Sequence, residues 1–126
     1  MKVADLLEGE PVTASAPESA ASVWERMHER RVDYVAVVDS AGRVVGLLSR
    51  QDLAGPSGGT RRRMGRTVGE LMHLDVVTVT PKTELRRAAA LMRKHATGCL
   101  PVVSRGKLVG VLTVSQLLVV LEHSKL

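Results

Sequence analysis

The chain contains an internal repeat, and this repeat limits its fold more than any other feature of the sequence. Sliding the 126 residues along themselves gives seven identities at an offset of 65 residues, including the Val-Thr pairs at 12–13 and 77–78. Five more identities follow at an offset of 64, because the next turn is one residue shorter in the second copy. We therefore divide the chain into two related halves, residues 1–54 and 67–126.

The composition changes between the two halves. Residues 55–60 are Gly, Pro, Ser, Gly, Gly and Thr, a composition typical of flexible connectors. We therefore assign residues 55–66 to a flexible linker, which is expected to make few packed contacts.

The overall composition is that of a globular protein, with 44% apolar and 25% charged residues. The longest uncharged run, residues 108–121, holds 14 residues, whereas a membrane-spanning helix needs about 20. No secretory signal pattern opens the sequence. The single cysteine, Cys99, excludes an internal disulfide and a cysteine-based structural zinc site. We therefore expect a cytoplasmic protein without a membrane segment.

One short segment supplies most of the net charge of +5, because it carries Arg61, Arg62, Arg63 and Arg66. Two interpretations of this cluster stay open: a solvated tether, or a surface that contacts ligand phosphates or nucleic acid by charge alone. The chain has one Trp, one Tyr and no Phe. It therefore lacks the aromatic platform on which binders of single-stranded nucleic acid stack bases, and nucleic acid is the least favoured partner.

Each half shows the same order of predicted elements. A short extended piece precedes a proline and then a helix, whose apolar side chains recur at i, i+3, i+4 and i+7. Two β-rich runs around a tight turn follow, and an amphipathic helix closes the half. The order is β-α-β-β-α. The helical stripes are Ala20, Val23, Trp24 and Met27 in the first half, and Leu85, Ala88, Ala89 and Met92 in the second.

The two predicted hairpins, residues 34–48 and 99–112, are apolar on both strands, so both faces of each sheet should be buried. A half of this size with two or three strands cannot cover both faces alone. We therefore expect an α+β fold of the α/β type, in which two small sheets pack about a pseudo-twofold axis with the helices outside.

The hairpins also carry a family resemblance. Leu100–Val103, the turn glycine Gly106 and Lys107–Thr113 resemble the core of a CBS domain, and residues 35–53 repeat this pattern. The Val-Thr-x-x-Pro pattern at 77–81 is also CBS-like. Because order, spacing and duplication all agree, the chain resembles a stand-alone pair of CBS repeats, also called a Bateman module.

The resemblance implies a regulatory protein rather than an enzyme. CBS pairs commonly bind AMP, ADP, ATP or S-adenosylmethionine in the clefts between their repeats, often associate as disc-shaped dimers, and regulate a partner protein. We therefore expect an adenosine ligand but no required cofactor, a homodimer, and a regulated protein that the sequence does not identify. The alternative is a CBS pair without a small ligand, acting as a scaffold for dimerisation or protein binding. The four histidines share no metal-ligand spacing, so no metal site is expected.

In the family, a Gly-hydrophobic-x-Thr/Ser-x-x-Asp stretch opens the last helix, and its aspartate accepts both ribose hydroxyls. Residues 46–52 fit this pattern fully and end in Asp52, whereas residues 110–116 end in Gln116, whose amide offers one acceptor oxygen and no charge. Ala36 also replaces the proline that the second half has, and these two departures favour the scaffold alternative. The alternative for Asp52 is helix capping alone.

The positions that match the family's clefts give the candidate ligand-binding residues. Tyr34 could stack on adenine or belong to the core, and Arg50 could add positive charge near a phosphate. Cys99 has no paired base, so we expect a small buried hydrophobe rather than a catalytic thiol. The candidates are Thr13, Asp33, Tyr34, Val35, Ala36, Ser49, Arg50 and Asp52 in the first half, and Thr78, Gly98, Cys99, Leu100, Pro101, Thr113 and Gln116 in the second.

Overall fold

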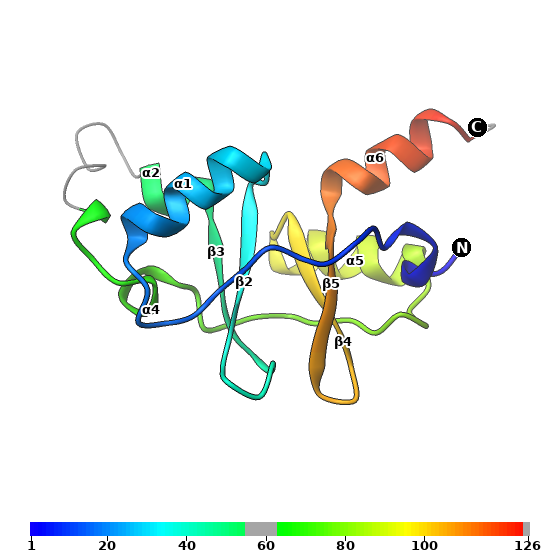
Figure 1. The fold of residues 1–126 in the computed structure, drawn as a ribbon. Coiled ribbons are helices and arrows are strands. Elements are labelled where there is room, and N and C mark those ends of the chain that lie inside the picture. The colour runs from blue at the N-terminus through cyan, green and yellow to red at the C-terminus, as the bar shows by residue number, and fades with distance from the viewer. Residues whose placement is uncertain (55–62, 125–126) are drawn as a thin grey trace. The chain divides into compact units, whose positions relative to one another are not determined.

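The computed structural model describes residues 1–54 and 63–124, and Figure 1 shows their fold as a ribbon. Helices and two small sheets alternate along the chain, which confirms the expected mixture of α and β elements. In chain order the elements are η1 (Val3–Leu6), β1 (Thr13–Ala14), α1 (Ala20–Arg30), β2 (Tyr34–Val38), β3 (Val44–Ser49), α2 (Arg50–Ala54), α4 (Val68–Leu71), α5 (Leu85–His95), β4 (Cys99–Ser104), β5 (Lys107–Thr113) and α6 (Val114–Glu122). None of the helices among the described residues is long and apolar enough to span a membrane.

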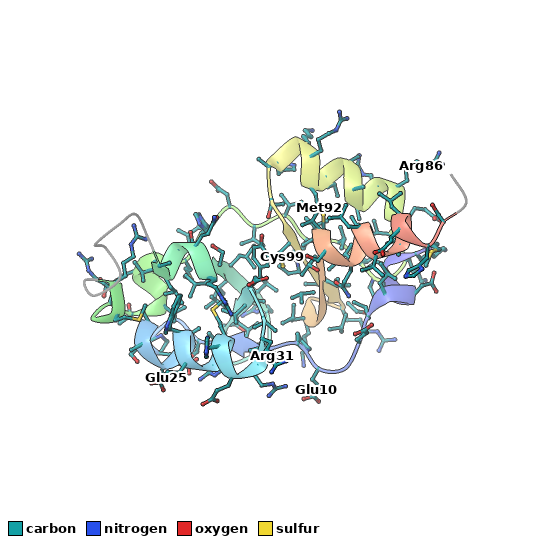
Figure 2. All side chains as sticks on the ribbon, turned by 90° about the horizontal axis from the view of Figure 1, so that it is seen from above. Glu10, Glu25, Arg31, Arg86, Met92 and Cys99 are labelled. Atoms are coloured by element: carbon teal, nitrogen blue, oxygen red, sulfur yellow. The ribbon has the colours of Figure 1, made fainter. Side chains whose placement is uncertain are left out.

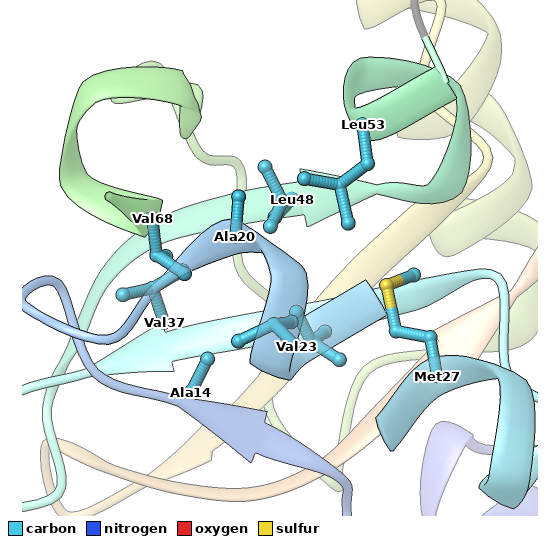
Figure 3. Packing of buried hydrophobic residues seen from close by; sticks show 9 residues of the cluster. Ala14, Ala20, Val23, Met27, Val37, Leu48, Leu53 and Val68 are labelled. Atoms are coloured by element: carbon cyan, nitrogen blue, oxygen red, sulfur yellow. The ribbon is translucent and has the colours of Figure 1, made fainter. Parts of the chain in front are cut away.

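The compact unit Pro11–Val76 contains a three-stranded sheet in the order β1-β2-β3. Strand β1 runs parallel to β2, and β2 pairs antiparallel with β3 across a turn. Helix α1 packs three fully buried side chains against this sheet, Ala20, Val23 and Met27. Figure 3 shows these side chains together with Val37 and Leu48 of the strands. The core is therefore built from aliphatic side chains and methionine, as the near absence of aromatic residues requires.

The second compact unit combines Met1–Glu10 with Val77–Leu126. Its sheet has two strands, β4 and β5, which pair antiparallel. The extended piece expected before α5 forms a single parallel bridge, Val79 to Val102, where the first half has strand β1. Helix α5 buries Leu85, Ala88 and Met92. Ala89, predicted to belong to the apolar stripe of α5, is exposed. Its position, four residues after Leu85, lies at the edge of the buried face of the helix.

The two compact units do not coincide with the two sequence repeats, because the short helix that begins each repeat packs in the compact unit of the other repeat. In one unit, the amides of Val3 and Ala4 donate to the carbonyls of Thr83 (2.8 Å) and Pro81 (2.9 Å). Figure 1 shows this N-terminal segment beside α5. Val3 is fully buried there, among aliphatic side chains of α5, β4 and β5.

The other unit contains the matching contact, one repeat offset along the chain. The amides of Val68 and Gly69 donate to the carbonyls of Glu18 (2.9 Å) and Ala16 (2.8 Å). Val68 is fully buried beside the α1 side chains. The repeats thus exchange their first helices. The sequence analysis predicted neither short helix, because its order of elements began each half with an extended piece, and it therefore did not predict the exchange.

Two arginines of the predicted linker make defined contacts. The Arg63 guanidinium donates to the main-chain oxygen of Asp52 at 2.5 Å, and Arg66 forms an ion pair with Glu70 at 3.0 Å. These two contacts tie the described part of the predicted linker, residues 63–66, to α2 and α4, and the assignment of residues 55–66 to a linker stays a prediction. Arg61 and Arg62 lie outside the described residues.

A glycine in each hairpin leaves room for a side chain of the exchanged segment. This segment is the short helix with the residues directly after it, Val3–Leu7 in one unit and Val68–His73 in the other. An added Cβ on Gly46 of β3 would overlap the sulfur of Met72 and come within 3.2 Å of the His73 main-chain oxygen. An added Cβ on Gly110 of β5 would lie 2.7 Å from a methyl group of Leu7. Both glycines are therefore required for close approach of the exchanged segment to the sheet.

The substitution Gly46→Ala should lower the free energy of unfolding by about 1–3 kcal/mol, the usual cost of overpacking. Urea denaturation measures this loss. The double variant Gly46→Ala with Met72→Ala should lose less than the sum of the two single variants, because the truncated residue 72 leaves room for the new methyl group. Strict additivity of the two losses would show that the two positions do not touch.

Candidate functional site

The first-half candidate residues lie at one end of the three-stranded sheet. Thr13 of β1 pairs with Ala36 of β2, and Tyr34 pairs with Ser49 at the end of β3. The Arg50 amide donates to the Asp33 carbonyl at 2.8 Å, which closes the corner between β2 and α2. The sheet register therefore brings all eight first-half candidates into one region of the Pro11–Val76 unit.

The candidates differ in what they can offer to a ligand. Val35 and Ala36 are fully buried, main chain included, and they lie in the central strand of the sheet, so they form the floor of this region and present no accessible atom. Tyr34 is half-buried. The Arg50 guanidinium lies 3.5 Å from a carboxylate oxygen of Asp33, and both side chains are well exposed, so this ion pair contributes little to stability.

The second-half candidates gather in the same way. Cys99 pairs with Thr113, and the Val114 amide donates to the Gly98 carbonyl at 2.9 Å. Thr78 adjoins this region because the next residue, Val79, donates its amide to the Pro101 carbonyl at 3.0 Å. Leu100 and Pro101 are buried as whole residues, and the Pro101 carbonyl already accepts from Val79.

Cys99 is 1% exposed, on the strand β4 shown in Figure 2. Burial raises the pKa of its thiol to about 12, so the reactive thiolate is absent at neutral pH. Its environment is that of a small buried hydrophobe. Across residues 1–54 and 63–124, no group of three or more His, Cys, Asp or Glu residues is placed to hold a metal ion.

The two helix starts are built as capping boxes. One carboxylate oxygen of Asp52 accepts from the amide and from the hydroxyl of Ser49, both at 2.8 Å, while the Asp52 amide donates to that hydroxyl at 3.1 Å. Gln116 and Thr113 repeat the arrangement, with the Thr113 amide donating to the Gln116 side-chain oxygen at 2.9 Å. Capping is therefore part of the role of these side chains in both halves.

Each capping side chain has a second partner, which comes from the exchanged segment. The other carboxylate oxygen of Asp52 lies 2.7 Å from Nε2 of His73. The Gln116 side-chain amide donates to the Leu6 main-chain oxygen at 2.9 Å. Sequence reasoning missed His73, which is 21 residues from Asp52. Its position directly after the residue that matches Leu7 was the available signal.

An ion pair that the sequence analysis also missed fixes the main chain at Thr13. The Arg26 guanidinium donates to the Thr13 carbonyl at 2.8 Å and pairs with the Glu18 carboxylate at 2.5 Å. The hydrogen bond from Arg26 is the main reason why the pKa of Glu18 lies below its ordinary value, although partial burial opposes the shift. This carboxylate also accepts from the Ser15 amide at 2.7 Å, so the Arg26–Glu18 pair ties α1 to Thr13 of β1 and to the residue directly after β1.

The duplicated architecture and the two capping boxes correspond to a known domain family. A model of the CBS domain matches residues 3–55 and, a second time, residues 68–123. The chain belongs to the CBS domain family. Each matched CBS repeat begins with the short helix that packs in the other compact unit.

Comparison with curated proteins places these CBS repeats beside parts of larger proteins. The chain is 41% identical over 90 residues to the magnesium transporter MgtE of Thermus thermophilus, an alignment that covers 71% of this chain and 19% of the transporter. The chain spans about a fifth of the length of such curated relatives.

Solved CBS structures have the same fold over nearly the whole chain. The CBS domain pair of protein MJ0100, in complex with 5-methylthioadenosine and S-adenosyl-L-methionine, superposes with a TM-score of 0.89 at 23% identity, covering 99% of this chain and 98% of that one. CBSX2 in complex with AMP superposes with a TM-score of 0.82 at 25% identity, covering 98% and 99%. The first of these likenesses establishes the fold of a CBS domain pair.

Replacing Glu18 with glutamine tests the ion pair that holds Thr13. A carboxylate with a lowered pKa stabilises the fold above its unfolded pKa, near 4.3, and that stabilisation is lost as the pH falls through the lower folded pKa. We expect Glu18→Gln to lower the free energy of unfolding by about 1 kcal/mol at pH 7. At pH 3 the difference from the parent should be clearly smaller.

The matched control is Glu25→Gln, on the exposed outer face of α1 (Figure 2). Chemical denaturation of both variants at the two pH values gives the comparison. A Glu18→Gln loss of equal size at pH 7 and pH 3 would mean that the ion pair does not contribute.

Proposed function

We propose that this CBS pair is a regulatory module that binds an adenosine ligand, such as AMP, ADP, ATP or S-adenosylmethionine, and thereby modulates a partner protein in the cytoplasm. The observation that carries the proposal is the Asp52 carboxylate at the junction of β3 and α2, in the sequence context that CBS repeats use for ribose. The adenosine compounds bound by the MJ0100 domain pair and by CBSX2 support the ligand class.

The proposed ligand would meet the main chain of β2, the Thr13 region and the first turn of α2. The Watson–Crick edge of adenine carries the N6–H donor and the N1 acceptor, and of residues 33–36 only Asp33 and Tyr34, at the start of β2, are exposed enough to meet it. Asp52 supplies charged acceptor oxygens for ribose hydroxyls, and hydrogen bonds to charged groups contribute more than neutral ones.

The two repeats offer unequal acceptors for ribose hydroxyls. The Asp52 side chain has two acceptor oxygens, whereas the Gln116 amide has one, which accepts from Thr113 while its nitrogen donates to Leu6. A neutral side chain with one acceptor oxygen is the weaker partner for two hydroxyls. We therefore assign the stronger site to the first repeat.

Calorimetric and thermal-shift titrations with AMP, ATP, S-adenosylmethionine and NAD test the proposal. A ligand at 100 times its dissociation constant stabilises the fold by about 2.7 kcal/mol, which raises the melting temperature by several degrees in a domain of this size. Asp52→Ala should weaken binding at least tenfold, because it removes charged hydrogen bonds. Gln116→Ala, its counterpart in the other repeat, should change affinity much less.

Asp52→Asn serves as the folding control, because its amide oxygen can still accept from the Ser49 amide. The assignment of the site fails if Asp52→Ala binds as tightly as the parent while Gln116→Ala does not. A chain that shows no shift with any of the four compounds favours the scaffold alternative.

The same proposal includes a homodimer. Three large apolar side chains of α6 lie on one face of the helix and are exposed: Val114 (41%), Leu118 (58%) and Leu121 (52%). Their spacing of four and three residues makes a continuous apolar stripe. A second copy of the chain would cover this stripe, and the scaffold alternative would use it as well.

Sedimentation at micromolar concentration should therefore show a species of twice the 13.6 kDa chain mass. Leu118→Glu places a charge in the centre of the stripe and should shift the protein to the 13.6 kDa species. Because Val119 (51% exposed) adds apolar surface on the adjoining face of α6, the matched control is Ser104→Glu, at the exposed end of β4, which should remain dimeric. A parent protein that sediments only as a monomer would contradict the dimer.

A further inference from the structure

The acceptor capacity of Asp52 is largely used before any ligand arrives. A carboxylate offers about four acceptor positions, two on each oxygen. Ser49 fills two of them on one oxygen through its amide and its hydroxyl, both at 2.8 Å. Nε2 of His73 lies 2.7 Å from the other oxygen, and because a carboxylate only accepts, Nε2 carries the hydrogen of this bond. One position therefore remains, whereas a ribose has two hydroxyls to place.

His73 is held at this site by its main chain rather than by its side chain. Its amide donates to the Leu47 carbonyl at 2.9 Å, and its carbonyl accepts from the Leu47 amide at 3.0 Å, which joins the exchanged segment to β3. The imidazole itself is 64% exposed, whereas the Asp52 side chain is only 18% exposed. The ring can therefore leave Asp52 by side-chain rotation while the main-chain contacts persist.

We propose that His73 is a positioning residue that competes with the ligand for Asp52 and so sets the affinity and the ribose dependence of this site. This inference rests on the proposed function, because it takes Asp52 as the ribose acceptor. A ligand that brings two ribose hydroxyls must displace the imidazole, and the lost hydrogen bond lowers its apparent affinity. A ligand without those hydroxyls leaves the imidazole in place.

In the other repeat, the described residues include no equivalent competitor. There the capping side chain, Gln116, bonds the main-chain oxygen of Leu6, which side-chain rotation of residue 6 does not move. The proposed competition is therefore confined to the Asp52 repeat, where a single substitution can remove it.

The test uses AMP as the probe and calorimetry on the full chain. His73→Leu removes the competing donor and should tighten AMP binding roughly threefold to tenfold, the usual range for one hydrogen bond. His73→Gln restores a side-chain N–H at a similar distance and should bind AMP within about twofold of the parent. A structural effect of position 73 would move both variants together, so this pair separates competition from loss of packing.

Ribose dependence gives the second readout. With 2′,3′-dideoxy-AMP, which has no ribose hydroxyls, His73→Leu should bind as the parent does. In an Asp52→Asn background, where the charge that holds the imidazole is absent, the His73→Leu gain for AMP should also disappear. A gain that persists with the dideoxy probe would overturn the proposal.

The outcomes for His73 and for the proposed function are distinct. If the parent binds AMP and His73→Leu leaves the affinity unchanged, the competition is refuted and the adenosine-ligand function stands. If only His73→Leu binds AMP, competition is supported in its strongest form. If neither protein binds AMP, both the competition and AMP as a ligand are refuted.

Discussion

The rest of the structure depends on the burial of Val3 and Val68. Each valine begins one repeat but is buried in the compact unit of the other repeat. Each valine is fully buried and begins a short helix whose first amides bond to carbonyls before the first long helix of the other repeat. Without these helices, each small sheet would lack part of its hydrophobic cover. Because a half of this size buries too little surface to be stable alone, the exchange makes folding of the two repeats interdependent.

The exchange also determines the chemistry of the candidate site. The turns at Ser49–Asp52 and Thr113–Gln116 form from local sequence, since a hydroxyl and an acceptor three residues later satisfy each other's amides. What lies against the remaining atoms of Asp52 and Gln116 is decided by the exchanged segments. They bring an imidazole to one and a main-chain oxygen to the other. Glycines 46 and 110 permit both approaches, because neither position has room for a Cβ.

The two repeats keep the apolar character of their cores but differ in charge at one candidate site. The buried positions of α1 and α5 are filled by comparable aliphatic and methionine side chains. By contrast, Asp52 of the first repeat corresponds to Gln116 of the second, and Ala36 corresponds to Pro101, at positions where the family resemblance implies ligand contacts. We expect one strong and one weak site in a pair of repeats with similar cores but different ligand positions. The ligand titrations decide between this arrangement and the scaffold alternative.

The repeat, the two hairpins, the long helices α1 and α5 and the family resemblance could all be predicted from the sequence, whereas the short helices Val3–Leu6 and Val68–Leu71 were not predicted. The predicted features follow from hydrophobic periodicity and from the register of neighbouring strands, both of which depend on residues close together in the chain. Only the tertiary structure decided that the first helices are exchanged, that His73 reaches Asp52, that Arg26 holds the Thr13 carbonyl, and that Arg63 caps α2. Each of these contacts joins residues at least 11 positions apart in the chain. The periodic pattern of neighbouring residues carries no information about such a contact.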